Sequence, residues 1–260
     1  MSGNLLTITS VNPVTGLAAD FTGKAQQVAV PIVTGLQAYH RFGLDLPNCL
    51  KNRAPISGTA AAKITGTGPI SIGTSPPSME SSGPSAGIQL GVPDSPNLTI
   101  ILAIEPLPVP PTPGVGSTFV ALCSTAVSTI LGFNFIFSTG LQLTAFCSGG
   151  TITPATLAMD DTRANIVSIE FDSSIPSAPV LTVRNHTANT VSARTGTFAL
   201  SPSGTGIYLG GTPVSTINNI GPCAYLTAEI HNSVLSTNDL NTAVSSISSK
   251  LALLTPPVIA

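Results

Sequence analysis

Residues 131–147 have the sequence LGFNFIFSTGLQLTAFC, in which apolar side chains recur at every second position. They form two runs: Phe133, Phe135 and Phe137, and then Leu141, Leu143 and Ala145. A period of two places one face of a β-strand in a core, so we expect Asn134 and Gln142 to face outward. The stretch therefore predicts two strands, at residues 132–137 and 142–146, each with one buried face.

Short segments rich in β-forming residues recur on both sides of this stretch, between clusters of turn-forming residues. They lie at residues 36–39, 64–67, 88–90, 98–104, 118–123, 166–171, 180–184, 196–200 and 206–209. The 24 glycines and 23 prolines interrupt every apolar run before residue 236, which excludes long helices there. So many short strands predict an all-β fold, either a sandwich or a barrel.

Two low-complexity stretches break this pattern and predict surface loops. Residues 70–84 are rich in Ser, Gly and Pro, and residues 105–116 have the sequence EPLPVPPTPGVG. Proline cannot donate a hydrogen bond to a central strand pair, so we expect the second stretch to run as polyproline II.

The end of the chain predicts one helix, at residues 237–251. Ser236 is a good N-cap, and Asp239 stands at the third helical position, where it completes a capping box. Apolar residues follow with helical spacing at Leu240, Val244, Ile247 and Leu251. We expect this helix to lie across one side of the sandwich and to cover an edge or an open end.

Residues 1–30 predict an extended N-terminal arm with β-forming segments at 5–8 and 28–30. The arm has too little apolar content for its own core, so we expect it to become ordered on a neighbouring sheet or particle surface. It then serves as the docking or oligomerisation element. The remaining residues, 31–260, form one domain, in which the sandwich covers about 31–254.

The composition excludes several classes of partner. Nine basic and 11 acidic residues give a net charge of −2, too little positive charge for the phosphate contacts of a nucleic-acid-binding protein. No stretch approaches the about 18 apolar residues of a membrane-spanning helix. Residues 1–20 lack Lys and Arg, so they do not resemble a secretory signal, and we expect synthesis in a cytosol.

Charged residues make up 8% of the chain, against about 25% in typical domains. Such a surface leaves large apolar and hydroxyl-rich areas that a monomer rarely exposes, so we expect a homo-oligomer.

We expect the four cysteines to be reduced, because a cytosol disfavours disulfides. They are Cys49, Cys123, Cys147 and Cys223. Cys123 and Cys147 end strands that could be neighbours, and they are the pair that could form a disulfide after lysis.

Four segments carry a resemblance to a known superfamily: Gly35–Tyr39 (GLQAY), Gly206–Gly211 (GIYLGG), Gly221–Ile230 (GPCAYLTAEI) and His231–Ser236 (HNSVLS). They resemble the opening strand, the L-G-G turn, the strand with a small residue before Glu, and the corner before the helix of concanavalin A-like, laminin-G-like jelly rolls. Residues 166–172 and 180–185 are similar to the central paired strands of these modules. The resemblance covers residues 31–254 and implies a jelly-roll β-sandwich.

Within such a sandwich the local chemistry predicts structural roles. Tyr208 and Leu209 point to opposite faces of their strand. Gly210 and Gly211 provide the positive φ of the following turn. Glu229, near the end of its strand, caps the loop behind the helix.

With few charged residues, an N-terminal arm and no resemblance to a secretory signal in residues 1–20, the chain looks most like virion proteins of tailed bacteriophages. This resemblance implies a non-enzymatic structural protein of the head surface, neck or tail. It would be located in the virion as a homo-oligomer, most simply a trimer, held to other virion proteins by residues 1–30. The alternative is a lectin-like adhesion module on the virion surface that binds a host glycan.

Glu170 and Asp172 are the best candidates for paired catalytic carboxylates, because they share one face of a predicted strand. Glycosidases of this fold have a strand with three acids, and here Pro176 and its neighbours replace the third. We therefore expect no catalytic residues, and pairing with Arg163, Arg184 or Arg194, or solvation, as the fate of these two acids.

Asp160, Asp161 and Asn165 are the one acid and amide cluster of the calcium-binding type, and a solvated turn or helix cap is the better explanation of them. His40, His186 and His231 are scattered and predict ordinary edge or loop histidines. We expect no metal and no cofactor. A sugar-binding site usually needs an exposed aromatic ring, but Tyr39, Tyr208 and Tyr225 all fall in predicted strands, which favours a scaffold over a lectin.

Overall fold

The computed structural model describes residues 34–54, 62–65, 70–74, 76–81, 87–93, 95–106, 118–123, 125–126, 129–130, 132–138, 142–148, 155–160, 162–196, 207–210 and 223–252. The arm predicted at residues 1–30 lies outside these residues. None of the helices in the described ranges is both long and apolar enough to cross a membrane.

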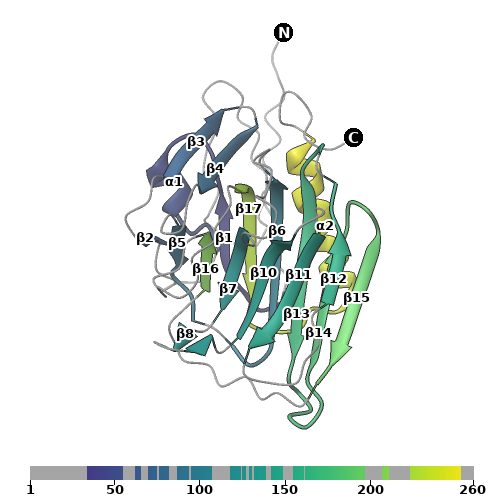
Figure 1. The fold of residues 1–260 in the computed structure, drawn as a ribbon. Coiled ribbons are helices and arrows are strands. Elements are labelled where there is room, and N and C mark those ends of the chain that lie inside the picture. The colour runs from purple at the N-terminus through teal and green to yellow at the C-terminus, as the bar shows by residue number, and fades with distance from the viewer. Residues whose placement is uncertain are drawn as a thin grey trace, which may run out of the picture.

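Eight strands of the described residues form one antiparallel sheet, sheet A (Figure 1). Across the sheet the order is β15 (Thr190–Thr195), β14 (Val180–Asn185), β13 (Asn165–Asp172), β6 (Leu98–Pro106), β17 (Cys223–His231), β4 (Pro77–Ser81) and β3 (Ile70–Thr74). The eighth strand, β1 (Leu36–Arg41), pairs with the second half of β17, while β4 pairs with its first half. Strand β17 is consequently buried along its whole length.

Seven further strands of the described chain form sheet B, which lies in front of sheet A in Figure 1. Their order is β12 (Ala155–Ala158), β11 (Gln142–Ser148), β10 (Gly132–Ser138), β7 (Thr118–Cys123), β16 (Ile207–Gly210), β5 (Gly87–Leu90) and β2 (Lys63–Thr65). A short ribbon of β8 (Thr125–Ala126) and β9 (Thr129–Ile130) stands apart. The predicted all-β fold is confirmed.

The alternating stretch at residues 131–147 forms β10 and β11, which pair antiparallel with Ser138 opposite Gln142. Gln142 is exposed and Leu143 is fully buried, as the alternation predicts. The side chains of Phe133, Phe135 and Phe137 lie outside the described part of the structure.

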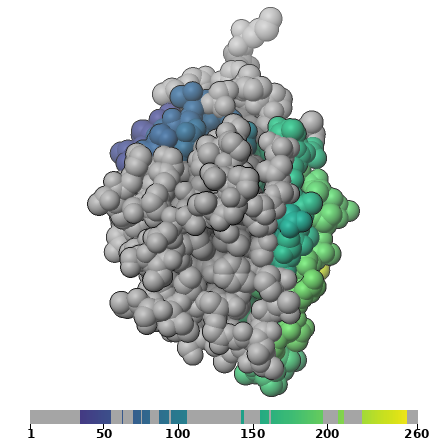
Figure 2. Space-filling view, viewed as in Figure 1, coloured from purple at the N-terminus to yellow at the C-terminus, as the bar shows by residue number. Residues whose placement is uncertain are grey.

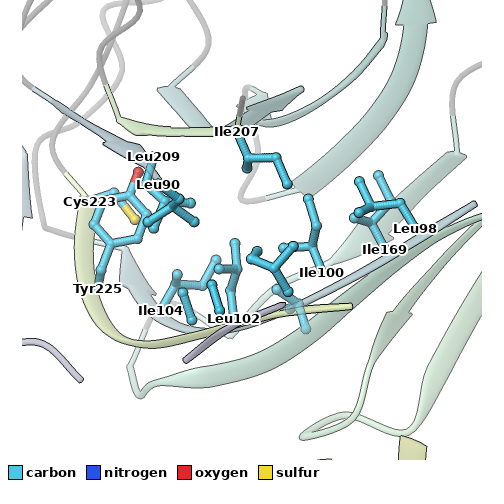
Figure 3. Close-up of a cluster of buried hydrophobic side chains, with 14 of the residues drawn as sticks. Leu90, Leu98, Ile100, Leu102, Ile104, Ile169, Ile207, Leu209, Cys223 and Tyr225 are labelled. Atoms are coloured by element: carbon cyan, nitrogen blue, oxygen red, sulfur yellow. The ribbon is translucent and has the colours of Figure 1, made fainter. Parts of the chain in front are cut away.

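The main core fills the space between the two sheets (Figure 3). From sheet A, every second side chain of β6 points into it: Leu98, Ile100, Leu102 and Ile104. They meet Leu90 of β5 and Ile207 and Leu209 of β16. All seven side chains are at most 1% exposed, and burial of each contributes about 1.5–3 kcal/mol to folding.

Helix α2 (Thr237–Leu251) lies behind sheet A in Figure 1, on the side turned away from sheet B. It begins where the sequence predicts, because the Ser236 side chain accepts a hydrogen bond from the Asp239 backbone N–H at 3.2 Å. Leu240, Ile247 and Leu251 are buried in a second, smaller core. In that core they pack with residues of sheet A and its flanks: Ile101, Ala103, Ala164, Ile166, Leu226 and Leu235.

The prediction of a surface loop at residues 70–84 is wrong, because β3 and β4 extend sheet A there. Ile70 and Ile72 pack on the main core and Met79 is fully buried in it. The many Ser, Gly and Pro residues obscured this short alternation. The start of the second predicted loop is also strand, since Glu105 and Pro106 belong to β6, and residues 107–117 lie outside the described residues.

Strand β15 ends at Thr195, one residue before the strand predicted at residues 196–200. Residues 197–200 lie outside the described ranges. Five of the six side chains of β15 are exposed and the sixth is half-buried. A strand with little burial on either face has no apolar alternation, which is why the sequence did not mark it.

The structure describes two of the cysteine side chains, the strand order at the other two cysteines, and the backbone of one predicted turn glycine. Cys49, in the short helix α1 (Leu46–Leu50), and Cys223 are buried free thiols. Strand β10 lies between β7 and β11, so the strands of Cys123 and Cys147 are not neighbours, contrary to the prediction. Gly210 has the expected positive φ, +73°.

Replacing Ile100 with Ala tests the main core. We expect a loss of about 2–5 kcal/mol in the free energy of unfolding, because the change leaves a cavity between the sheets. The control is Val191→Ala on β15, where the side chain is 58% exposed and the change should stay within about 0.5 kcal/mol. Urea unfolding measures both, and equal effects would contradict this description of the core.

Candidate functional site

The outer face of sheet A, which is turned away from sheet B, carries three groups of polar side chains. Helix α2 covers the middle of this face through its contacts with Ile101 and Ile166. The first group lies on β13 and β14 beside the helix, the second lies under the helix, and the third lies on β4 and β6. Strand pairing brings each group together from distant parts of the sequence.

The first group is the polar platform, formed by Ser168, Glu170, Thr182, Arg184 and Val191. Ser168 stands opposite Arg184 and Glu170 opposite Thr182, while Val191 of β15 stands opposite Arg184. Their neighbours Ile169 and Val183 lie in the main core, so the platform side chains point outward. Figure 2 shows the green β14–β15 segment at the surface along the right margin of the molecule.

An ion pair forms the centre of the polar platform. The Arg184 Nε donates to the Glu170 Oε1 at 2.7 Å. The Glu170 side chain is 9% exposed and the Arg184 side chain is 38% exposed. The exposed fraction rises further to 58% at Val191 on the next strand, β15. The platform is thus deepest next to α2 and opens toward β15.

A serine and histidine pair adjoins the platform. The Ser168 Oγ lies 2.9 Å from the Nε2 of His186, which follows β14. Burial and the nearby Arg184 lower the pKa of His186 to about 4, so its neutral ring can accept the serine proton. Ser168 itself is fully buried. A nucleophile must reach its substrate, so this pair favours a positioning role over nucleophilic catalysis.

The second group is the charged cluster, formed by Tyr39, Glu229, His231 and Lys250. Tyr39 of β1 stands opposite Glu229 of β17, and Lys250 reaches down from α2 to lie 4.2 Å above the Tyr39 ring centre. All four residues are at most 3% exposed. Burial lowers the pKa of Lys250 to about 8 against the opposing influence of the Glu229 charge.

The third group is a pair of carboxylates. Glu80 of β4 and Glu105 of β6 flank the same residue, Ala224 of β17, from its two sides. The pKa of Glu105 is raised, first by burial and then by the charge of Glu80. The sequence gives no sign of this pair, because it depends on the order of the strands.

The candidate carboxylates Glu170 and Asp172 do share the outer face of β13. Of the three arginines that the sequence offered to them, Glu170 binds Arg184. The Asp172 Oδ1 accepts a hydrogen bond from the Ser174 backbone N–H at 2.9 Å. Both acids therefore have contacts that fix the local structure.

The candidate calcium ligands Asp160 and Asn165 face different ways. The Asp160 carboxylate closes a turn with Thr162 and pairs with the Arg163 Nε at 2.7 Å. Hydrogen bonds from Thr162 hold the pKa of Asp160 below its usual value. The Asn165 side chain is fully buried and bonds to Asn185 and to backbone groups. Asp161 lies outside the described residues.

His40 does lie on an edge strand, since β1 pairs with β17 alone among the described strands, although its side chain is fully buried. The prediction of an edge or loop histidine is wrong for His231, which is fully buried on β17 between β6 and β1. The prediction that Glu229 caps a loop is also wrong, because its carboxylate lies in the charged cluster. The two corrections, for His231 and Glu229, have one cause: this half of β17 has β6 on one side and β1 on the other, which places both residues in the interior of the sheet. Tyr39, Tyr208 and Tyr225 are at most 5% exposed, as predicted from their strand positions.

Comparison with protein-family models and with curated proteins gives no match. Solved structures do match. The binding domain of botulinum neurotoxin DC in complex with SialylT aligns with a TM-score of 0.58 and 10% identity, over 82% of this chain and 52% of that one. The binding domain of botulinum neurotoxin serotype C1 aligns with a TM-score of 0.53 and 9% identity, over the same shares.

A sialidase of Trypanosoma rangeli in complex with sialic acid aligns with a TM-score of 0.54 and 11% identity, over 92% of this chain and 37% of that one. The chain has the jelly-roll β-sandwich fold. It spans about half the length of the toxin binding domains that it matches. At these identities the likeness concerns the fold of the jelly roll alone.

The buried histidines predict that the jelly roll loses stability in acid. Burial lowers the pKa of His40 and of His186 to about 4, from an ordinary value of 6.5. Between these values the unfolded chain binds two protons that the folded chain does not. The contribution of these two histidines to the free energy of unfolding should therefore be highest above pH 6.5, fall toward pH 4, and level off below it.

Each histidine contributes up to about 1.4 kcal/mol per pH unit to this slope. The variant His186→Gln should remove about half of the histidine contribution, one proton of two, between pH 6.5 and pH 5. Urea unfolding at several pH values measures the slope. A slope unchanged by the variant would contradict the neutral state of the half-buried His186 imidazole.

Proposed function

We propose that this chain is a non-enzymatic, lectin-like carbohydrate-binding module, and that the polar platform is its binding surface. The single observation that carries the proposal is the Glu170–Arg184 ion pair, which stands on the outer face of a jelly roll. Support comes from the matched structures, since one is a toxin binding domain in complex with SialylT and another a sialidase in complex with sialic acid.

The chemistry of the platform suits hydroxyl groups. A guanidinium donates several hydrogen bonds in a fixed plane, so the 38% exposed Arg184 side chain can donate to sugar hydroxyls while the 9% exposed Glu170 carboxylate holds it in position. The pair is already formed in the structure, at 2.7 Å, so binding does not have to order either side chain first. Because its charges cancel, the platform does not require a charged ligand.

The apolar part of the platform is aliphatic. Val191 stands opposite Arg184 and is 58% exposed, so its methyl groups can meet the carbon-bound face of a sugar ring. Every aromatic side chain whose burial the structure describes is at most 5% exposed: Tyr39, Phe42, Phe171, Tyr208 and Tyr225. A site on this face would thus rely on hydrogen bonds more than on ring stacking, which is consistent with weak binding strengthened by multiple copies.

A glycan array that includes sialylated and neutral oligosaccharides tests the proposal. We expect binding, and an affinity loss of about tenfold or more in the variant Arg184→Met, because the change leaves the Glu170 carboxylate without its partner. The matched control is Arg163→Met, since the Arg163 side chain is also 38% exposed and also forms a 2.7 Å ion pair.

The control should bind within about twofold of the original protein. An array without any bound glycan contradicts the proposed function. Equal losses in the two arginine variants contradict the placement of the site on the polar platform.

A second candidate function is a structural component of a tailed-bacteriophage particle, located in the virion, for which the low content of charged residues and the N-terminal arm are the starting point. Strand β15 favours it, because it ends sheet A in the described chain and its side chains are largely exposed. Such an edge can accept a strand from another subunit or from the particle surface. In this candidate, residues 1–30 attach the protein, and it forms a homo-oligomer, most simply a trimer.

Light scattering and particle incorporation test the second candidate. We expect a trimer at micromolar concentration, and loss of incorporation into particles when residues 1–30 are deleted. A monodisperse monomer contradicts the oligomer, and a dimer contradicts only the number of subunits. Full incorporation of the deleted form contradicts the role of the arm.

A further inference from the structure

The charged cluster under α2 is unusual in a chain in which only 8% of residues are charged. Glu229 and His231 are fully buried and Lys250 is 3% exposed. Among the described residues, four of their polar atoms are buried without a hydrogen-bond partner: both Glu229 carboxylate oxygens, the His231 Nε2 and the Lys250 Nζ. Buried charges without hydrogen bonds are costly, so their retention calls for a physical reason.

The position of His231 gives the first part of that reason. Its Nδ1 lies 3.3 Å from the backbone oxygen of Thr34, and its Nε2 lies 3.6 Å from the Glu229 Oε2. Both ring nitrogens therefore face oxygen acceptors. A carboxylate and a ring nitrogen attract each other only when a proton or another cation lies between or beside them.

Lys250 provides a cation beside them from a different element. Its Nζ lies 4.2 Å above the Tyr39 ring centre, and the Glu229 charge favours its protonated form while Arg41 of β1 opposes it. Lys250 is also in the last turn of α2, where a positive charge is favourable for the helix dipole. The attraction between Lys250 and Glu229 therefore acts on the last turn of α2, next to Leu251.

We propose that Glu229, His231 and Lys250 form a charge latch, which holds the C-terminal end of α2 on sheet A and releases it when one charge is lost. Without the Glu229 charge, Lys250 is left buried with the like charge of Arg41 nearby. Removing one partner of a buried pair is more costly than removing both, because a single uncompensated charge remains. The end of the helix then moves into solvent, which uncovers the apolar residues beneath it.

A divalent metal ion is the competing explanation of the facing Glu229 and His231. Within the described residues, no group of three His, Cys, Asp or Glu side chains could hold a metal ion, and Lys250 adds a positive charge to the space. The latch therefore predicts purified protein without bound zinc. One zinc ion per chain, detected by elemental analysis and lost in Glu229→Gln, overturns it.

Hydrogen exchange of the full chain tests the latch with a double-mutant cycle. In Glu229→Gln, and separately in Lys250→Met, we expect the protection of amides 244–251 to fall by about tenfold or more. In the double variant we expect protection within about threefold of the original, because Glu229 and Lys250 are removed together and neither charge stays buried without the other. The control is Asp160→Asn, which breaks an exposed ion pair and should leave α2 unchanged.

Unchanged protection in both single variants overturns the latch, and so do losses that simply add in the double variant. If a single variant does not fold, the double variant decides alone: a folded double variant supports the latch, and an unfolded one overturns it. None of these results depends on whether the polar platform binds a glycan, so the two proposals stand or fall separately.

Discussion

The pairing of β17 is the constraint on which the rest of the structure depends. This strand of nine residues pairs with β6 on one side and with both β4 and β1 on the other, so it has neighbouring strands along both edges. Tyr225, Ala228 and Ile230 enter the main core from its inner face. The outer face must then be covered as well, and α2 follows directly after β17 to cover it.

The two faces of sheet A are covered in different ways. The inner face is apolar and packs on sheet B in the manner of an ordinary sandwich. The outer face mixes the small apolar core under α2 with charged side chains that have few partners. In a chain with so few charges, the placement of Glu170, Glu229 and Lys250 on this one face concentrates the polar chemistry there.

The outer face also separates a closed region from an open one. Under α2 the charged cluster is sealed, so its chemistry can act on the helix but not on a large ligand. Beyond the helix, exposure rises from Glu170 through Arg184 to Val191. A large partner can reach the polar platform but not the charged cluster, because access to solvent differs between them.

The sequence by itself determined the elements whose pattern is local. The alternation at residues 131–147 marked β10 and β11, and the Ser236 cap with its apolar spacing marked α2, because a period of two or 3.6 residues follows from backbone geometry alone. The acids Glu170 and Asp172 were placed on one face for the same reason.

Only the tertiary structure decided the rest. It paired β1 with β17, where His40 and His231 are buried. It paired Glu170 with Arg184, one of three possible arginines. It also placed Glu80 and Glu105 on either side of Ala224. These outcomes depend on the order of strands in the sheet, and strand order is fixed by the packing of segments far apart in the chain.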